Sequence, residues 1–247
     1  MLIPTLLLVS VLATSILSGL LGMAGGMILM AILVSVVSVA SAMMIHGAVQ
    51  ATANGSRAWF LRSHIQWHIL PAYALGAITT LGGFTLWSLI PPPGVVLVVV
   101  GIFPWLARIL PRFSGLDVTR KPVAFACGVV VTSAQLLAGA SGPLLDVFYL
   151  NSQLDRYQII ASKAFTQTLG HLLKIVYYGR IVRALDDTVS EVGLVFYAVA
   201  MATAVVGTRI GTLLLDRFSD AHFRRVSGNV ILAIATVCVI KGVVELV

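Results

Sequence analysis

Long apolar runs, separated by short polar or glycine-rich breaks, cover most of this chain. Runs such as 2–21 and 123–138 approach the roughly 20 apolar residues that a helix needs to cross about 30 Å of hydrocarbon. The strict apolar and polar alternation of a membrane barrel strand does not occur in them. Because every backbone amide in lipid must be bonded within its own segment, such runs indicate helices. The pattern therefore predicts an all-α integral membrane protein.

Glycine, proline and charge clusters divide the chain into ten expected helical segments. We expect them near residues 2–20, 27–40, 42–62, 68–90, 94–110, 121–138, 143–150, 157–179, 189–215 and 226–246. Two of them are short, and eight residues at about 1.5 Å rise per residue cover only about 12 Å. We therefore expect 27–40 and 143–150 to be half-helices that enter the membrane and stop.

The two halves of the chain share one pattern. We interpret 1–110 as a first membrane repeat, 111–120 as a cytoplasmic linker and 121–247 as a second repeat. In each repeat a glycine cluster breaks an apolar run, and a short helix and then a helix with four polar residues follow. Those polar sets are His46, Gln50, Asn54 and Arg57, and Lys163, Gln167, His171 and Lys174. Both are spaced by four, four and three residues, which keeps each set on one helix face.

The distribution of basic residues predicts the orientation in the membrane, because Lys and Arg in short loops favour the cytoplasm. If the chain begins outside and all ten segments cross, one side receives Arg62, Arg108, Arg112, Arg120, Lys121, Arg156, Arg217, Arg224 and Arg225. The other side receives Arg180 and Arg183. We therefore expect a multi-pass protein of the cytoplasmic (inner) membrane with both termini outside. An odd number of segments in each half makes the two repeats inverted.

Composition supports a membrane protein and argues against several other classes. The chain is 59% hydrophobic, against roughly 45–50% in soluble domains, and only 10% charged. Its net charge of +7 comes from basic residues scattered in short loops, which does not indicate nucleic-acid binding. Cys127 and Cys238 lie singly in apolar runs, so we expect no metal and no cofactor. Neither an HExxH helix nor a Ser/His or paired-aspartate arrangement is apparent, so we do not expect an enzyme.

Ionisable residues inside membrane segments are costly, roughly 2.5–3.5 kcal/mol each, and are therefore functional candidates. Arg57, Lys163, Lys174 and Arg209 lie in expected helices, and Asp146 is the one acid at comparable depth. One carboxylate cannot neutralise four cations, so we expect a small anionic substrate, with Asp146 a candidate for ion coupling. Two alternatives stay open: Lys163 could pair with Asp146, and Arg57 and Lys174 could extend to the membrane interface.

The glycine breaks indicate anion binding for a second reason. A half-helix that begins after Gly26 or Gly142 presents unpaired N–H groups and the positive end of its dipole. Pro143 suits the first position of such a helix, because no N–H is needed there. The competing interpretation is packing, since Gly22 and Gly26 have the GxxxG spacing that brings helices close together.

Gln50 and Gln167 occupy equivalent positions, and their amides can donate hydrogen bonds to an oxyanion. His46 and His171 could donate to the substrate, titrate during proton coupling or bridge two helices. The candidate substrate-binding residues are Gly25, Gly26, His46, Gln50, Asn54, Arg57, Ser141, Gly142, Lys163, Gln167, His171 and Lys174.

These residues resemble those of a known family. The second half contains Gly139-Ala140-Ser141-Gly142-Pro143-Leu144-Leu145-Asp146, then Ala161-Ser162-Lys163-Ala164, Gln167, His171 and Lys174. This set resembles the second repeat of the sulfite exporter TauE/SafE family of membrane permeases, and the first half is similar through its cluster at 22–26. The resemblance implies a transporter of small sulfur-containing anions such as sulfite or organosulfonates. The first half departs from the family at Ala24, at Met43-Met44 and in lacking a proline within 27–31.

The sequence therefore predicts a permease that works by alternating access around a central anion site. The alternatives are a non-transporting membrane assembly or scaffold protein, and a permease of the same fold for another small anion or a carboxylate. Import or export, coupling to protons or sodium, and homo-oligomerisation stay open.

Overall fold

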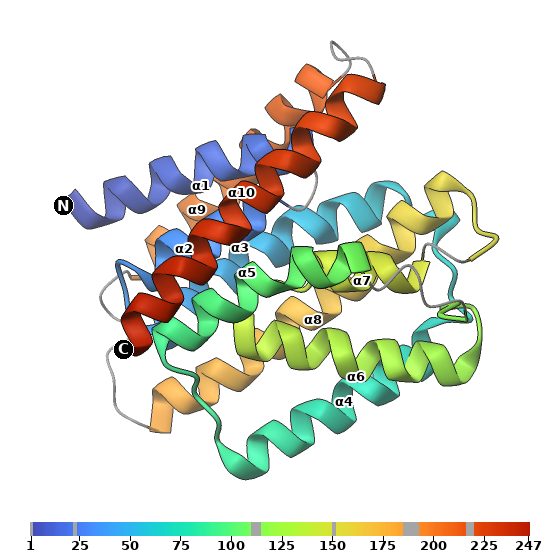
Figure 1. Ribbon diagram of the computed structural model, residues 1–247, viewed down its shortest axis with the longest axis horizontal. Helices are drawn as coiled ribbons and strands as arrows, with labels where there is room; N and C mark the ends of the chain where they lie inside the picture. The colour runs from blue at the N-terminus through green and yellow to red at the C-terminus, as the bar shows by residue number, and fades with distance from the viewer. Residues whose placement is uncertain (1, 22–23, 110–114, 150–151, 185–192, 216–219) are drawn as a thin grey trace.

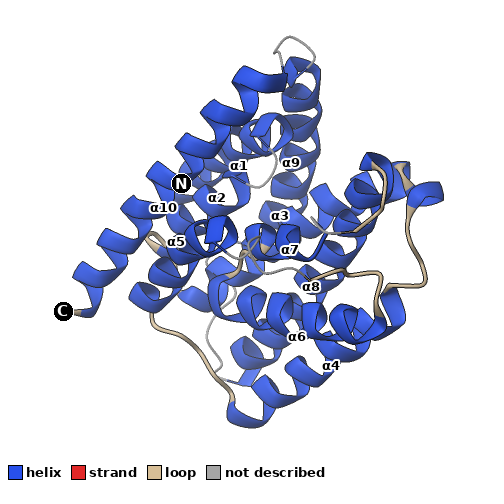
Figure 2. Cartoon of the chain, turned by 45° about the vertical axis from the view of Figure 1, so that its right-hand side comes forward, coloured by secondary structure: helices blue, strands red, loops and turns tan. Residues whose placement is uncertain are grey.

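A computed structural model of the chain describes residues 2–21, 24–109, 115–149, 152–184, 193–215 and 220–247. All regular structure within these ranges is helical (Figure 2). The α-helices are α1 Leu2–Leu21, α2 Ala24–Val34, α3 Val39–Phe60, α4 Leu70–Trp87, α5 Pro93–Ile109, α6 Lys121–Ala138, α7 Gly142–Tyr149, α8 Arg156–Ala184, α9 Leu194–Leu215 and α10 Asp220–Leu246. A 3₁₀ turn, η1, spans Arg62–His64.

Most helices begin and end within a few residues of the predicted bounds, but the first short helix was placed wrongly. It was expected at 27–40, whereas α2 runs from Ala24 to Val34 and α3 begins at Val39. The side chain of Ser38 explains why α3 starts earlier than the expected residue 42, because it caps the helix by accepting a hydrogen bond from the Ser41 backbone N–H at 3.3 Å. A serine just before a helix accepts a hydrogen bond from one of the unpaired backbone N–H groups of the first helical turn, which favours the start of the helix at the next residue.

The outer surface is apolar, as a protein in lipid requires. Leu194, Val195 and Leu213 on α9 and Val237 and Val244 on α10 are all exposed. Lys121–Ala138, Leu194–Gly211 and Asn229–Leu246 are long and apolar enough to cross a bilayer, and shorter apolar helices accompany them. Large exposed apolar surfaces are unusual on soluble monomers. The chain is therefore a multi-pass helical membrane protein.

Helices far apart in the sequence pack together in pairs (Figure 1). The most extensive contacts join α1 to α9, α4 to α6, α5 to α10 and α3 to α8. Glycines bring α4 and α6 close together, since a Cβ on Gly76 would overlap the Phe125 carbonyl and one on Gly128 would overlap that of Tyr73. Small residues at such crossings let two backbones approach closely.

The α3–α8 pair occupies the interior and positions the polar residues of both halves. A Cβ on Gly47 would lie 2.7 Å from Ile175, and one on Gly55 would lie 3.5 Å from Thr168. Residue numbers rise along one helix as they fall along the other, so α3 and α8 run antiparallel. The short helix α2 packs on α3, and α7 packs on α8.

Candidate functional site

The two predicted polar sets meet at one place in the α3–α8 contact. The side-chain nitrogen Nζ of Lys174 on α8 lies 2.8 Å from Nδ1 of His46 on α3. The rings of His46 and His171 lie 5.5 Å apart between their centroids. Residues near the start of one set thus meet residues near the end of the other. The helical spacing predicted two polar faces, and the structure brings them together.

Lys174 is completely buried. Besides its contact with His46, Nζ donates a hydrogen bond to the Gly139 carbonyl at 3.0 Å. Among the described residues, no carboxylate lies within 4.0 Å of it. The alternative that Lys174 extends to the membrane interface is therefore wrong, because its side chain ends in the protein interior.

Gln135 on α6 joins this group, although it was not among the sequence candidates. Its Nε2 donates to the Gly139 carbonyl at 3.2 Å and lies 2.5 Å from Nδ1 of His171, while its Oε1 accepts from the Ser141 hydroxyl at 2.6 Å. Gln135 is only 1% exposed. An amide four residues before a glycine break in an otherwise apolar run was the signal that could have revealed it.

Both glycine breaks border the meeting point of α3 and α8. The carbonyl of Gly26, near the start of α2, accepts a hydrogen bond from Nε2 of His46 at 2.9 Å. Gly139 adopts a positive φ of 71° that ends α6, and α7 begins at the buried Gly142. Gly25 packs closely against α1, since a Cβ there would overlap the Thr14 carbonyl.

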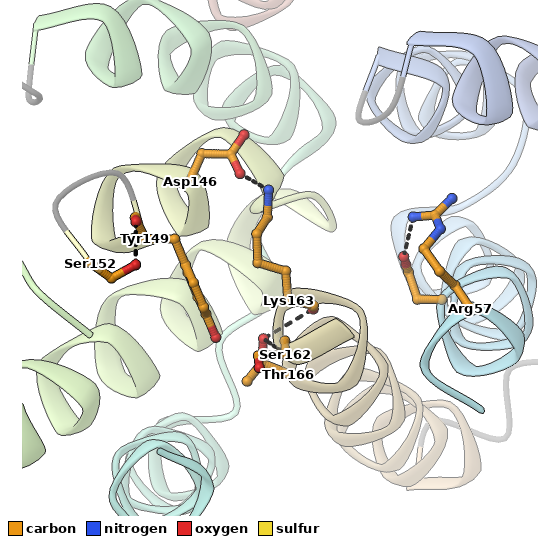
Figure 3. Close-up of polar contacts among 8 residues, drawn as sticks. Arg57, Asp146, Tyr149, Ser152, Ser162, Lys163 and Thr166 are labelled. Carbon is orange, nitrogen blue, oxygen red and sulfur yellow. Dashed lines mark hydrogen bonds and ion pairs between the residues drawn. The ribbon is translucent and has the colours of Figure 1, made fainter. Parts of the chain in front are cut away.

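A second polar group lies nearer the start of α8. Lys163 forms an ion pair with Asp146 on α7, so the open alternative of this pairing is confirmed (Figure 3). The Lys163 side chain is 20% exposed and that of Asp146 is 31% exposed. Asp146 also lines a cavity of about 340 Å³, together with Met27, Pro104, Arg108, Pro143 and Val147. The carboxylate of this ion pair thus borders a cavity, and the two charges of the pair balance.

The remaining candidates lie along the same two helices. Gln50 and Asn54 are buried on α3, and Gln167 is half-buried on α8. The guanidinium of Arg57 donates to Oδ1 of Asn54 at 3.5 Å, and Figure 3 shows it on α3, apart from the Lys163 ion pair. Arg209, counted among the membrane cations, is exposed and lies 5.5 Å from the centroid of the Phe60 ring. It does not contribute charge to the interior.

We call the group of Lys174, His46, His171, Gln135 and Ser141 the central cluster. Its members come from α3, α6, α8 and the turn before α7, and each is at most 4% exposed. In the part of the chain that the structure describes, no three His, Cys, Asp or Glu side chains come together as metal ligands. The cluster offers N–H donors and a nitrogen that can carry positive charge, which is the chemistry of an anion site.

Comparison with known proteins supplies the family. The family model described as sulfite exporter TauE/SafE matches residues 6–237, nearly the whole chain. Comparisons with curated proteins and with solved structures gave no match. The match spans the glycine breaks, both polar helix faces and the helices around them. The chain therefore belongs to the sulfite exporter TauE/SafE family, whose members are membrane transporters for sulfite and related anions.

Proposed function

We propose that the protein is a secondary transporter that moves a small sulfur-containing anion, such as sulfite or an organosulfonate, across the cytoplasmic membrane. The anion binds where α3 and α8 meet, beside the starts of α2 and α7. Alternating access exposes this site to one side of the membrane and then to the other. Family membership supports the anion class.

The burial of Lys174 is the observation that carries this proposal. Its amine has no carboxylate partner among the described residues, whereas Lys163 has Asp146. A cationic side chain in the membrane interior is costly unless a counter-charge is nearby. A bound anion supplies that counter-charge and accepts hydrogen bonds from the cluster. In this proposal Lys174 is therefore the main contact to the anion, and Lys163, Gln167 and the first backbone amides of α7 are further contacts.

The helix pairing supports two inverted repeats, 1–110 and 121–247. Each helix of the first half has a counterpart in the second half, so that α1 corresponds to α6 and α4 to α9. When every helix is replaced by its counterpart, the α1–α9 pair becomes the α6–α4 pair, and the α3–α8 and α5–α10 pairs are unchanged. The antiparallel course of α3 and α8 agrees with opposite orientations of the two halves. Transporters built from inverted repeats hold their substrate at the repeat interface, where the central cluster lies.

In this proposal both termini face outward and the basic loops face the cytoplasm. A negative-inside potential favours efflux of an uncoupled anion by about 2.3 kcal/mol per charge per 100 mV. Uptake against that potential requires a coupled ion.

A ligand-dependent thermal shift assay tests anion binding. Purified protein is heated with sulfite, methanesulfonate, sulfate, acetate or chloride, because a ligand that binds only the folded state raises the melting temperature. We expect the sulfur oxyanions to stabilise the protein more than acetate or chloride does. Stabilisation by acetate alone would favour a carboxylate permease. The absence of stabilisation by every anion would favour a non-transporting scaffold and contradict the proposal.

A further inference from the structure

The hydrogen-bond donors of the central cluster can be assigned from their acceptors. A carbonyl oxygen only accepts, so Nε2 of His46, 2.9 Å from the Gly26 carbonyl, carries a hydrogen. In a neutral ring, Nδ1 is then the acceptor, and Lys174 donates to it at 2.8 Å. Lys174 also donates to the Gly139 carbonyl at 3.0 Å. Lys174 therefore uses two N–H donors in this structure.

Two donors are what an uncharged amine has, and an ammonium has three. The neutral form of Lys174 satisfies His46 and Gly139 with no donor left over. The charged form leaves one N–H without an acceptor among the described residues and places a full charge in a site 0% exposed. Both consequences are unfavourable in a membrane interior. The two contacts of Lys174 are therefore complete without the additional proton.

Among the residues that the structure describes, no acidic side chain forms an ion pair with Lys174. The titratable groups that face it in the described structure are His46 from α3 and His171 from its own helix. The uncharged Gln135 amide of α6 donates to the same Gly139 carbonyl as Lys174, and near the start of α2 the Gly26 carbonyl accepts from His46. The Asp146 carboxylate on α7 forms an ion pair with Lys163, about three helical turns away from Lys174 on α8. A bound anion is the remaining source of negative charge.

Resting on the proposed function, we propose that Lys174 is the proton-coupling site, and that it takes up one proton when the anion binds and releases it when the anion leaves. The proton comes from the aqueous side to which the site is open and adds to the lone pair of Nζ. The third N–H so created donates to the anion. On the opposite side the anion departs, Nζ returns the proton to water, and the neutral empty site reorients.

Proton coupling at Lys174 determines which gradients drive transport. A monovalent anion and one proton cross together with no net charge, so the membrane potential does no work on the step. The concentration gradient of the anion and the pH gradient then decide the direction. An uncoupled anion carrier behaves differently, because its flux follows the potential.

The test uses the full-length protein in proteoliposomes that contain a pH-sensitive dye. The probes are labelled methanesulfonate, thiosulfate and sulfate, which stay fully ionised near neutral pH, so any proton that moves with them is carried by the protein. We expect an inward proton gradient to drive probe accumulation, one proton to enter with each anion, and methanesulfonate flux to be unaffected by a potassium diffusion potential. Flux of these probes without proton movement would overturn the coupling and leave the proposed function intact.

Transport confined to sulfite, which can carry a proton itself, would also overturn the assignment to Lys174. Absence of transport of every anion, sulfite included, would overturn the proposed function and the coupling with it. The variant K174R keeps a charge but does not release its proton, so its proton-driven accumulation should fall by about tenfold or more, about 1.4 kcal/mol, and by more than its anion exchange. The matched control is K241R on α10, whose side chain is 46% exposed. Equal loss of accumulation in both variants would contradict a special role for Lys174.

Discussion

At the residue scale, the decisive difference is between two lysines on the same helix. Lys163 has a carboxylate partner, and Lys174 has a histidine and a carbonyl. The spacing of polar residues predicted that both lie on one face of α8, and that prediction follows from helical periodicity alone. Which of the two lysines has a carboxylate partner depends on where α7 and α3 pack against α8. No local sequence pattern specifies that packing. For the same reason Gln135 was missed, because its role arises from the approach of α6 to α8.

Removal of the Asp146 carboxylate should release Lys163 to interact with the anion. We expect D146N to lower the KM for sulfite by roughly three- to tenfold, because opposite charges at close range contribute on the order of 1 kcal/mol. The matched variant K163Q should raise KM by a similar factor. Both are measured as initial rates of labelled sulfite flux in proteoliposomes. If D146N instead abolished net transport while exchange persisted, coupling would belong to Asp146, the acid first suggested by the sequence.

At the element scale, glycine determines how closely helices approach. Helix bounds could be predicted because apolar runs end at glycines, prolines and charges. The pairing of α4 with α6 and of α1 with α9 could not, because many apolar faces are compatible before packing selects one. GxxxG spacing marks small residues but does not reveal their partner. Gly25 illustrates this, since its close contact with α1 is not apparent from the glycine pattern of the sequence.

Two glycines of α4 provide a matched pair of variants that tests whether glycine allows the close approach of α4 to α6. A Cβ on Gly76 would overlap the Phe125 carbonyl of α6, whereas a Cβ on Gly82 would meet nothing within 4 Å. We expect G76A to destabilise the protein by about 1–3 kcal/mol through overpacking. G82A should leave stability unchanged or raise it by up to about 1 kcal/mol, because alanine favours helix. Thermal unfolding in detergent measures both, and equal melting temperatures for the two variants would rule out a close α4–α6 crossing.

At the scale of the whole molecule, the membrane class and the ten helices follow from composition and apolar run length. The arrangement around the central cluster follows from contacts between the halves, which bring His46 within 2.8 Å of Lys174 although 128 residues separate them in the chain. A site built from both halves is suited to alternating access, since a rocking motion of one half against the other alters it directly. In this structure every member of the central cluster is at most 4% exposed.

The most direct test of the central claim is efflux of labelled sulfite from proteoliposomes loaded with it. The wild-type protein is compared with K174M, which removes the buried amine, and with K241M, which removes an exposed one. The account predicts rapid efflux from wild type and K241M, and an efflux rate that is lowered by about tenfold or more in K174M. The melting temperature of K174M shows whether this variant is folded. Sulfite efflux that is unchanged in a folded K174M variant would contradict the account.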